Sequence, residues 1–146
     1  MLFLDTSALI KRYVAEAGSD LVIERMSADT VWTASALAQL ETQVTLCHLG
    51  LDEATEADLH ARATSDWERF IVVSLAAPMT DRAVDIACRH RLRTLDAIHL
   101  AAAAQLPPPF TFVTFDAKQA AAAHDLGFLV EGARVHKRVT RVGRRQ

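Results

Sequence analysis

Four acidic residues in this chain have positions that would suit metal-dependent chemistry. They are Asp5, Glu41, Asp96 and Asp116. Four carboxylates gathered in one crevice would repel one another unless cations neutralised them. Oxygen ligands of this kind favour Mg²⁺ or Mn²⁺ over zinc. Such a site activates water and stabilises the charge that builds on a phosphate during in-line attack. The chemistry indicated is phosphodiester hydrolysis.

Each acid also has a structural explanation. Asp5 and Asp116 each end a short apolar run and precede a helical pattern, a position where Asp commonly caps the helix. Asp96 falls in the first turn of a predicted helix, where the helix dipole stabilises an acid. Glu41 lies within an apolar helical stripe, where it must either be paired or reach solvent at the edge of the stripe. The residues alone leave both explanations open.

Runs of apolar and β-branched residues predict five short strands, separated by helical patterns. The predicted strands are 2–4, 31–33, 71–75, 110–115 and 128–130. Alternating strands and helices predict an α/β fold with a mainly parallel sheet of about five strands flanked by helices. The run 71–75 is the richest in β-branched residues, which predicts a central strand. In a parallel sheet, Asp5 and Asp116 would share the carboxyl edge, where ligands bind.

Helical periodicity predicts which side chains are buried on three helices. The predicted buried stripes are Leu37, Leu40, Val44 and Cys47; Ala83, Val84, Ala87 and Cys88; and Leu95, Ile98, Ala102 and Leu106. His99 has no second His at ligand spacing, so we expect a hydrogen-bonded structural histidine. The two cysteines show no CxxC or Cys/His ligand spacing, which predicts core positions and neither a disulfide nor a zinc site.

Length and composition indicate one ordinary globular domain. The chain has 146 residues, of which 51% are hydrophobic, and a formal net charge of -2. No apolar run reaches the roughly 18 residues of a membrane span, and the interrupted apolar start does not match a signal peptide, so we expect a cytoplasmic protein without a membrane partner. Five bases and no acid lie between Lys137 and Gln146. We therefore divide the chain into a domain at 1–132 and a basic tail at 133–146.

Two basic segments are candidate RNA contacts. One is the tail, with Lys137 and Arg138, which either holds phosphates or is a solvated end. The other is the cluster of Arg89, Arg91 and Arg93. Cations near a helix C-terminus are favoured by the helix dipole, so this cluster has a structural explanation beside phosphate contact.

Four segments together resemble a known family. Leu4-Asp5-Thr6-Ser7-Ala8-Leu9, Glu41, Leu95-Asp96-Ala97-Ile98-His99-Leu100-Ala101 and Val113-Thr114-Phe115-Asp116 resemble the PIN domain, specifically the VapC-type toxins of bacterial toxin–antitoxin pairs. The resemblance runs from about Met1 to Val130. It implies a metal-dependent endoribonuclease with a parallel sheet, usually a homodimer, held silent by a VapB-type antitoxin.

Carried over by position, the resemblance assigns roles to single residues. It implies a catalytic acidic site of Asp5, Glu41, Asp96 and Asp116. Of these, Asp5, Asp96 and Asp116 would bind Mg²⁺ or Mn²⁺, and Ser7 and Thr114 would be supporting hydroxyls. Family members often carry a further acid shortly after the last one, where this chain has Lys118 and Gln119, so a second metal position is in question. An antitoxin arginine paired with two carboxylates would displace a metal.

Two rival functions remain at this stage. The first is a PIN-like module that holds RNA or protein without cutting it; an Asp5→Asn variant separates the two, since only a nuclease should lose turnover. The second is a phosphatase or phosphotransfer domain, which also uses an Asp after its first parallel strand. Those phosphatases resemble an Asp-x-Asp pattern, whereas this chain has Ser7 at the second position.

Overall fold

The structure is a computed structural model that describes residues 1–133. Its strands are β1 (Leu2–Leu4), β2 (Trp32–Ser35), β3 (Ile71–Val73), β4 (Thr111–Thr114) and β5 (Leu129–Gly132). Its helices are α1 (Thr6–Tyr13), α2 (Ser19–Ala28), α3 (Ala36–Cys47), α4 (Glu53–Trp67), α5 (Ala77–His90), α6 (Thr94–Ala103) and α7 (Ala117–Asp125). None of these described helices is both long and apolar enough to cross a membrane.

The five strands form one parallel sheet in the order β3-β2-β1-β4-β5. Leu2 lies opposite Trp32 on one side and Thr111 on the other, so β1 is the central strand. Because β1 and β4 are parallel neighbours, the residues that follow them, Asp5 and Asp116, lie at the same edge. The α/β fold predicted from the sequence is confirmed.

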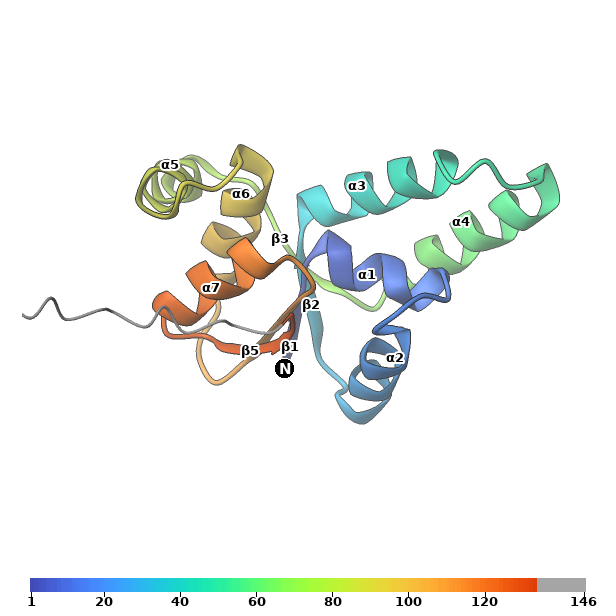
Figure 1. Ribbon diagram of the computed structural model, residues 1–146, viewed down its shortest axis with the longest axis horizontal. Helices are drawn as coiled ribbons and strands as arrows, with labels where there is room; N and C mark the ends of the chain where they lie inside the picture. Colours follow the sequence, from blue (N-terminus) through green and yellow to red (C-terminus); the bar gives the residue numbers. More distant parts are fainter. Residues whose placement is uncertain (134–146) are drawn as a thin grey trace, which may run out of the picture.

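Side chains of the central strands alternate between two helical layers. Leu2, Leu4 and Val113 pack with α1 and α2, whereas Phe3 and Phe112 pack with α5, α6 and α7. The rings of Phe3 and Phe112 stack with centroids 5.3 Å apart. Figure 1 shows α1 and α2 on one side of the sheet and α6 and α7 on the other. Burial on both faces is what holds the short strands, and their ends, in fixed positions.

The strand predicted to be central lies at the edge of the sheet. β3 pairs with β2 alone, and Ile71 is 56% exposed. The prediction was wrong because β-branched residues favour any strand, whether it is central or at the edge of the sheet. The central strand is instead β1, which the sequence marks only by three apolar residues.

The predicted buried stripe of α3 is rotated in the structure. Leu40 is 61% exposed and Val44 is also exposed, while Ala38, Thr42 and Leu46 face the protein. The small side chains of Ala38 and Thr42 let α3 approach its neighbours, a preference that hydrophobicity alone does not reveal. The stripe that we predicted is therefore largely a solvent-facing surface.

The same error affects α5, α6 and the two cysteines. On α5, Val84 is exposed, and on α6, Leu95 is exposed, whereas alanines of α6 lie in the core. Cys47 and Cys88 are both exposed free thiols, so the expectation that they fill core gaps was wrong. In Ala-rich helices the hydrophobic signal is spread around the helix, and close packing selects the small face.

The helices α3 and α4 form a hairpin that extends away from the sheet (Figure 1). A separate small cluster of Tyr13, Leu46, Leu59 and Ala63 holds the hairpin to α1. Asp66 adds polar contacts: it accepts hydrogen bonds from Arg12 Nε at 2.6 Å and from the Tyr13 hydroxyl at 3.1 Å. The hairpin thus has its own small core, apart from the two large layers.

Candidate active site

Asp5 lies between the end of β1 and the start of α1, and both oxygens of its carboxylate accept hydrogen bonds. Its Oδ1 accepts hydrogen bonds from the Ala8 backbone N at 2.9 Å and from Ser7 Oγ at 2.7 Å. Its Oδ2 accepts from Thr114 Oγ1 at 2.7 Å. Only 3% of the residue is exposed. Asp5 is therefore the cap of α1, as the structural explanation predicts, and also a buried carboxylate at the carboxyl edge of the sheet.

Burial raises the pKa of Asp5 above the ordinary value for an aspartate. The hydrogen bonds from Thr114, Ser7 and Ala8 and the charge of His99 act in the opposite direction but do not outweigh the loss of hydration. An ionised carboxylate in this place is costly to the protein alone. A bound cation would offset that cost.

Ser7 and Thr114 connect the ends of the two central strands. Ser7 Oγ accepts a hydrogen bond from the Phe115 backbone N at 2.8 Å while it donates to Asp5. Thr114 Oγ1 accepts from the Asp116 backbone N at 3.1 Å while it donates toward Asp5. The structure thus places both hydroxyls against Asp5, where the resemblance puts its supporting residues.

Asp116 caps α7 and is linked to Asp96 through a residue that the sequence analysis missed. Asp116 Oδ1 accepts from the Gln119 backbone N at 2.8 Å. The Gln119 side chain is 1% exposed; its Oε1 lies 2.9 Å from Thr114 Oγ1, and its Nε2 donates a hydrogen bond to the Asp96 backbone O at 3.1 Å. Asp followed three residues later by Gln is a capping-box pattern, which offered a signal. Here the amide positions α6 against α7 instead.

Glu41 is held by groups from two other helices. Its Oε1 accepts a hydrogen bond from Thr6 Oγ1 at 2.7 Å and lies 2.6 Å from His99 Nε2. Burial alone would raise the pKa of Glu41, but these hydrogen bonds and the charge of His99 lower it below its usual value. His99 Nδ1 lies 2.9 Å from Ser35 Oγ at the end of β2. The expected hydrogen-bonded role of His99 is confirmed, and that role is to fix Glu41.

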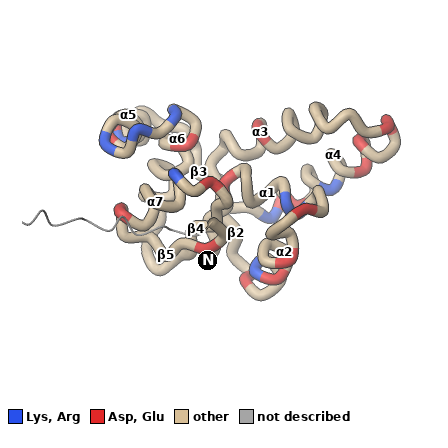
Figure 2. The backbone as a smooth tube through the Cα atoms, viewed as in Figure 1, with Lys and Arg blue, Asp and Glu red and all other residues tan. Residues whose placement is uncertain are grey.

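Arg93 brings a positive charge to the acids. Its Nε lies 3.0 Å from Asp96 Oδ2. The pKa of Arg93 is raised first by the hydrogen bond and charge of Asp96, and also by the charges of Asp116 and Glu41. One exposed guanidinium is therefore influenced by three of the four acids. Figure 2 shows acidic residues gathered where α6, α7 and the start of α1 meet.

The four acids share one edge but do not form a compact ligand set. Within residues 1–133, no three of their carboxylate oxygens lie within 4.8 Å of one another. Their donor set, oxygen atoms alone, fits a hard cation such as Mg²⁺. Closer approach would require a cation to neutralise their repulsion, with Arg93 turning away from Asp96.

Among the residues that the structure describes, Arg89 and Arg91 pair with none of the four acids. Arg89 pairs with Asp85 along the exposed face of α5, 2.9 Å from Nε to Oδ1, and Arg91 ends that helix in a left-handed conformation. Lys137 and Arg138 lie outside the described residues. Of the predicted cluster, the structure brings Arg93 to an acid of the site.

Comparison with known proteins places the chain in a family. The model of the PIN domain matches residues 2–125. The chain belongs to the PIN domain family. Ribonuclease VapC45 of Mycobacterium tuberculosis (strain CDC 1551 / Oshkosh) is 31% identical over 141 residues, which cover 92% of this chain and 97% of that protein. The resemblance to the VapC type predicted from the sequence is confirmed.

Solved structures share the fold of this PIN domain. The M. tuberculosis VapC20 structure, described as a sarcin-ricin loop cleaving toxin, superposes with a TM-score of 0.70 at 16% identity, over 88% of this chain and 97% of that one. A chain of a toxin-antitoxin complex from Klebsiella pneumoniae superposes with a TM-score of 0.69 at 18% identity, over 93% and 100%. At these identities the likeness supports the fold alone.

Proposed function

We propose that this PIN-domain protein is a metal-dependent endoribonuclease and the toxin of a VapBC-type toxin–antitoxin pair. The observation that carries the proposal is the buried carboxylate of Asp5, held at the carboxyl edge beside Asp116, with its pKa raised by burial. Relatives named as VapC ribonucleases over nearly the whole chain give the reaction class.

Asp5, Asp96 and Asp116 are the proposed ligands of Mg²⁺ or Mn²⁺. The ion would supply an activated water and stabilise the charge that develops on the scissile phosphate. Ser7 and Thr114 orient Asp5 for this task through their hydroxyls. Gln119 sets the separation of α6 and α7, and so of Asp96 and Asp116.

Glu41 completes the proposed catalytic acids. Its lowered pKa keeps it ionised at neutral pH, so it can accept a proton from the attacking water. Thr6 and His99 hold its Oε1 in one place. The carboxylate is thereby oriented before substrate binds, which reduces the reorganisation that the reaction requires.

Arg93 is the basic residue best placed to meet an RNA phosphate near the acids. It is the N-cap residue of α6, and its side chain is 81% exposed. Arg89, Arg91 and the tail residues Lys137 and Arg138 remain proposed RNA contacts. We keep the division into a nuclease domain at 1–132 and a basic tail at 133–146, in a cytoplasmic protein, as part of the proposal.

A VapB-type antitoxin and a second copy of the chain are the proposed protein partners. The ion pair between Arg93 and Asp96 shows that Asp96 can accept a guanidinium group. An arginine from an antitoxin that pairs with two of the acids would exclude a cation in the same way. A complex that keeps full metal affinity and activity would exclude this mode of inhibition.

The test is cleavage of total cellular RNA by the purified protein with Mg²⁺, with Mn²⁺ and with EDTA. We expect discrete cuts that require metal and disappear in Asp5→Asn and Asp96→Asn. Asp20→Asn, an exposed acid of α2, is the matched control and should cut normally. If no condition gives cuts and no antitoxin has copurified, the rival function of a non-cutting binding module replaces the nuclease.

A further inference from the structure

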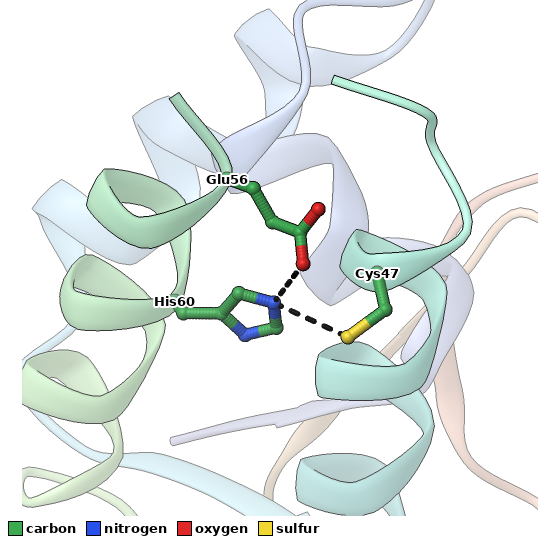
Figure 3. Close-up of side chains that lie close together, drawn as sticks. All are labelled: Cys47, Glu56 and His60. Atoms are coloured by element: carbon green, nitrogen blue, oxygen red, sulfur yellow. Dashed lines mark hydrogen bonds and ion pairs between the residues drawn. The ribbon is translucent and has the colours of Figure 1, made fainter. Parts of the chain in front are cut away.

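A second group of candidate ligands lies at the far end of the α3–α4 hairpin. Cys47 ends α3, and Glu56 and His60 lie one turn apart on α4 (Figure 3). Their sulfur, carboxylate oxygen and ring nitrogen all lie within 4.8 Å of one another. Among residues 1–133 this is the group of three that meets that distance, and it uses none of the acids of the candidate active site.

The two distances from His60 Nε2 match those of a tetrahedral metal shell. His60 Nε2 lies 3.4 Å from Cys47 Sγ and 3.5 Å from Glu56 Oε1. Zinc bonds of about 2.3 Å to sulfur and about 2.0 Å to nitrogen or oxygen place tetrahedral ligands about 3.3 to 3.6 Å apart. The three side chains can therefore surround one ion with little movement.

The hydrogen bond on the other side of the His60 ring fixes its tautomer. His60 Nδ1 contacts Gln43 Oε1, and Gln43 Nε2 donates to Thr64 Oγ1 at 3.3 Å, so the amide turns its oxygen to the ring. An amide oxygen accepts only, so Nδ1 carries the proton. In the neutral ring, Nε2 then presents a lone pair to the Glu56 carboxylate and the Cys47 thiol. Ligating histidines are commonly oriented by such an outer carbonyl.

We propose that Cys47, Glu56 and His60 bind a borderline divalent cation of the zinc type. The mixed sulfur, nitrogen and oxygen donors favour Zn²⁺ over Mg²⁺. Binding deprotonates the Cys47 thiol, and the proton goes to solvent as the sulfur–metal bond forms. Cys47 is exposed, so a water completes the shell. The ion would join the two helices beside the turn of the hairpin, whose other end carries Glu41.

The sequence predicted no zinc site because the two cysteines lack a CxxC or a Cys/His ligand spacing. Glu56 and His60, four residues apart, do share a helix face, and this was the available signal. Cys47 joins them only because the hairpin turns between Leu49 and Leu51 and brings the two helices together. That fold-back is a tertiary event that ligand spacing does not encode.

The first test is protection of the thiols of the full-length protein from alkylation, with and without added Zn²⁺ and without chelator. We expect equimolar Zn²⁺ to slow alkylation of Cys47 by about tenfold or more, since the thiolate is shared with the metal. Cys88, the other exposed thiol, is the internal control and should react at an unchanged rate. His60→Gln and Glu56→Gln should abolish the protection.

A second test uses Co²⁺ as a spectroscopic probe. A thiolate-to-cobalt charge-transfer band should appear, disappear in Cys47→Ser and persist in Cys88→Ser. Gln43→Ala should weaken cation affinity by about 10- to 100-fold, as for other outer partners of a ligating histidine. Equal alkylation of Cys47 with and without Zn²⁺, or a cobalt band that survives in Cys47→Ser, overturns the proposal. In that case the cluster is a group of neighbouring polar side chains that does not bind a cation.

Discussion

The acidic edge of the sheet and the end of the α3–α4 hairpin are two candidate cation sites built in opposite ways. At the edge, Asp5 is buried and held by hydroxyls from two adjacent strand ends, and every proposed ligand is an oxygen. At the hairpin, three donors of different chemistry meet between two helices near solvent. The edge resembles a site for a hard cation in catalysis, and the hairpin a site for a softer cation in structure.

The difference shows how burial of a ligand side chain changes its need for a cation. Asp5 has a raised pKa and needs a cation to offset the cost of its charge. The donors of the hairpin depend less on a cation, because water reaches them and can hydrate their charges. We therefore expect the two sites to respond to different metals and to be separable by mutation.

Asp5→Asn should give the largest effect, a loss of RNA cleavage of more than about a hundredfold. Removal even of an outer partner of a metal ligand costs about 10- to 100-fold, and Asp5 is a proposed ligand itself. Its folded-state pKa is raised, so the stability it contributes is present at low pH and lost as pH rises through that pKa. At neutral pH without metal the variant should therefore unfold at the same Tm or higher.

Thermal unfolding and cleavage assays on the same Asp5→Asn preparation check both halves of this prediction. Asn caps helices about as well as Asp, so the Ala8 hydrogen bond has a replacement acceptor. A variant that loses activity because it unfolds would contradict the separation of function from stability.

Asp66→Asn should lower the free energy of unfolding by about 1 to 3 kcal/mol, as for a charged hydrogen-bonded pair. Burial raises the pKa of Asp66, but Arg12 and Tyr13 lower it more, so the net shift is downward. Its contribution is present above about pH 4 and is lost as pH falls through the folded-state pKa. Urea unfolding at pH 7 and pH 3 should show the deficit shrinking, while Asp58→Asn, exposed on the same helix, stays at the wild-type value.

Arg93→Ala should reduce the salt dependence of RNA binding by about one unit of slope, if Arg93 contacts a phosphate. Removal of residues 137–146 should flatten the slope further if the tail binds RNA. The measurement is affinity against salt concentration for a metal-free Asp5→Asn background, which prevents cleavage. Arg62→Ala, exposed on α4, serves as the control, and an unchanged slope in Arg93→Ala would exclude the contact.

The smallest expected effect on RNA cleavage is that of Cys47→Ser, and it tests whether the two sites are independent. Cys47→Ser should leave metal-dependent RNA cleavage unchanged and remove the Zn²⁺ response of the hairpin. Asp5→Asn should do the reverse, with Cys47 still protected by Zn²⁺. If Cys47→Ser lowers cleavage as strongly as Asp5→Asn, the hairpin is part of the active site and the comparison fails.

The sequence by itself determined the order of strands and helices and the positions of the acids along them. Strand ends and helix caps are local features, so the apolar run before Asp5 and the pattern around Asp116 predict their place at the edge. In a parallel sheet, the carboxyl ends of the two strands then lie at the same edge. The same reasoning applies to Ser7 and Thr114, which lie within two residues of these acids.

Tertiary structure decided the rotation of the helices, the order of strands in the sheet and the hairpin cluster. Leu40 faces solvent and Ala38 faces the core because close packing favours small side chains, which hydrophobic periodicity does not weigh. Three features depend on contacts between residues that are distant in the chain or lie on different elements. They are the edge position of β3, the hydrogen bond of the Gln119 amide to Asp96, and the contact of Cys47 with His60. Such contacts follow from the packing of whole elements, and local patterns do not carry that information.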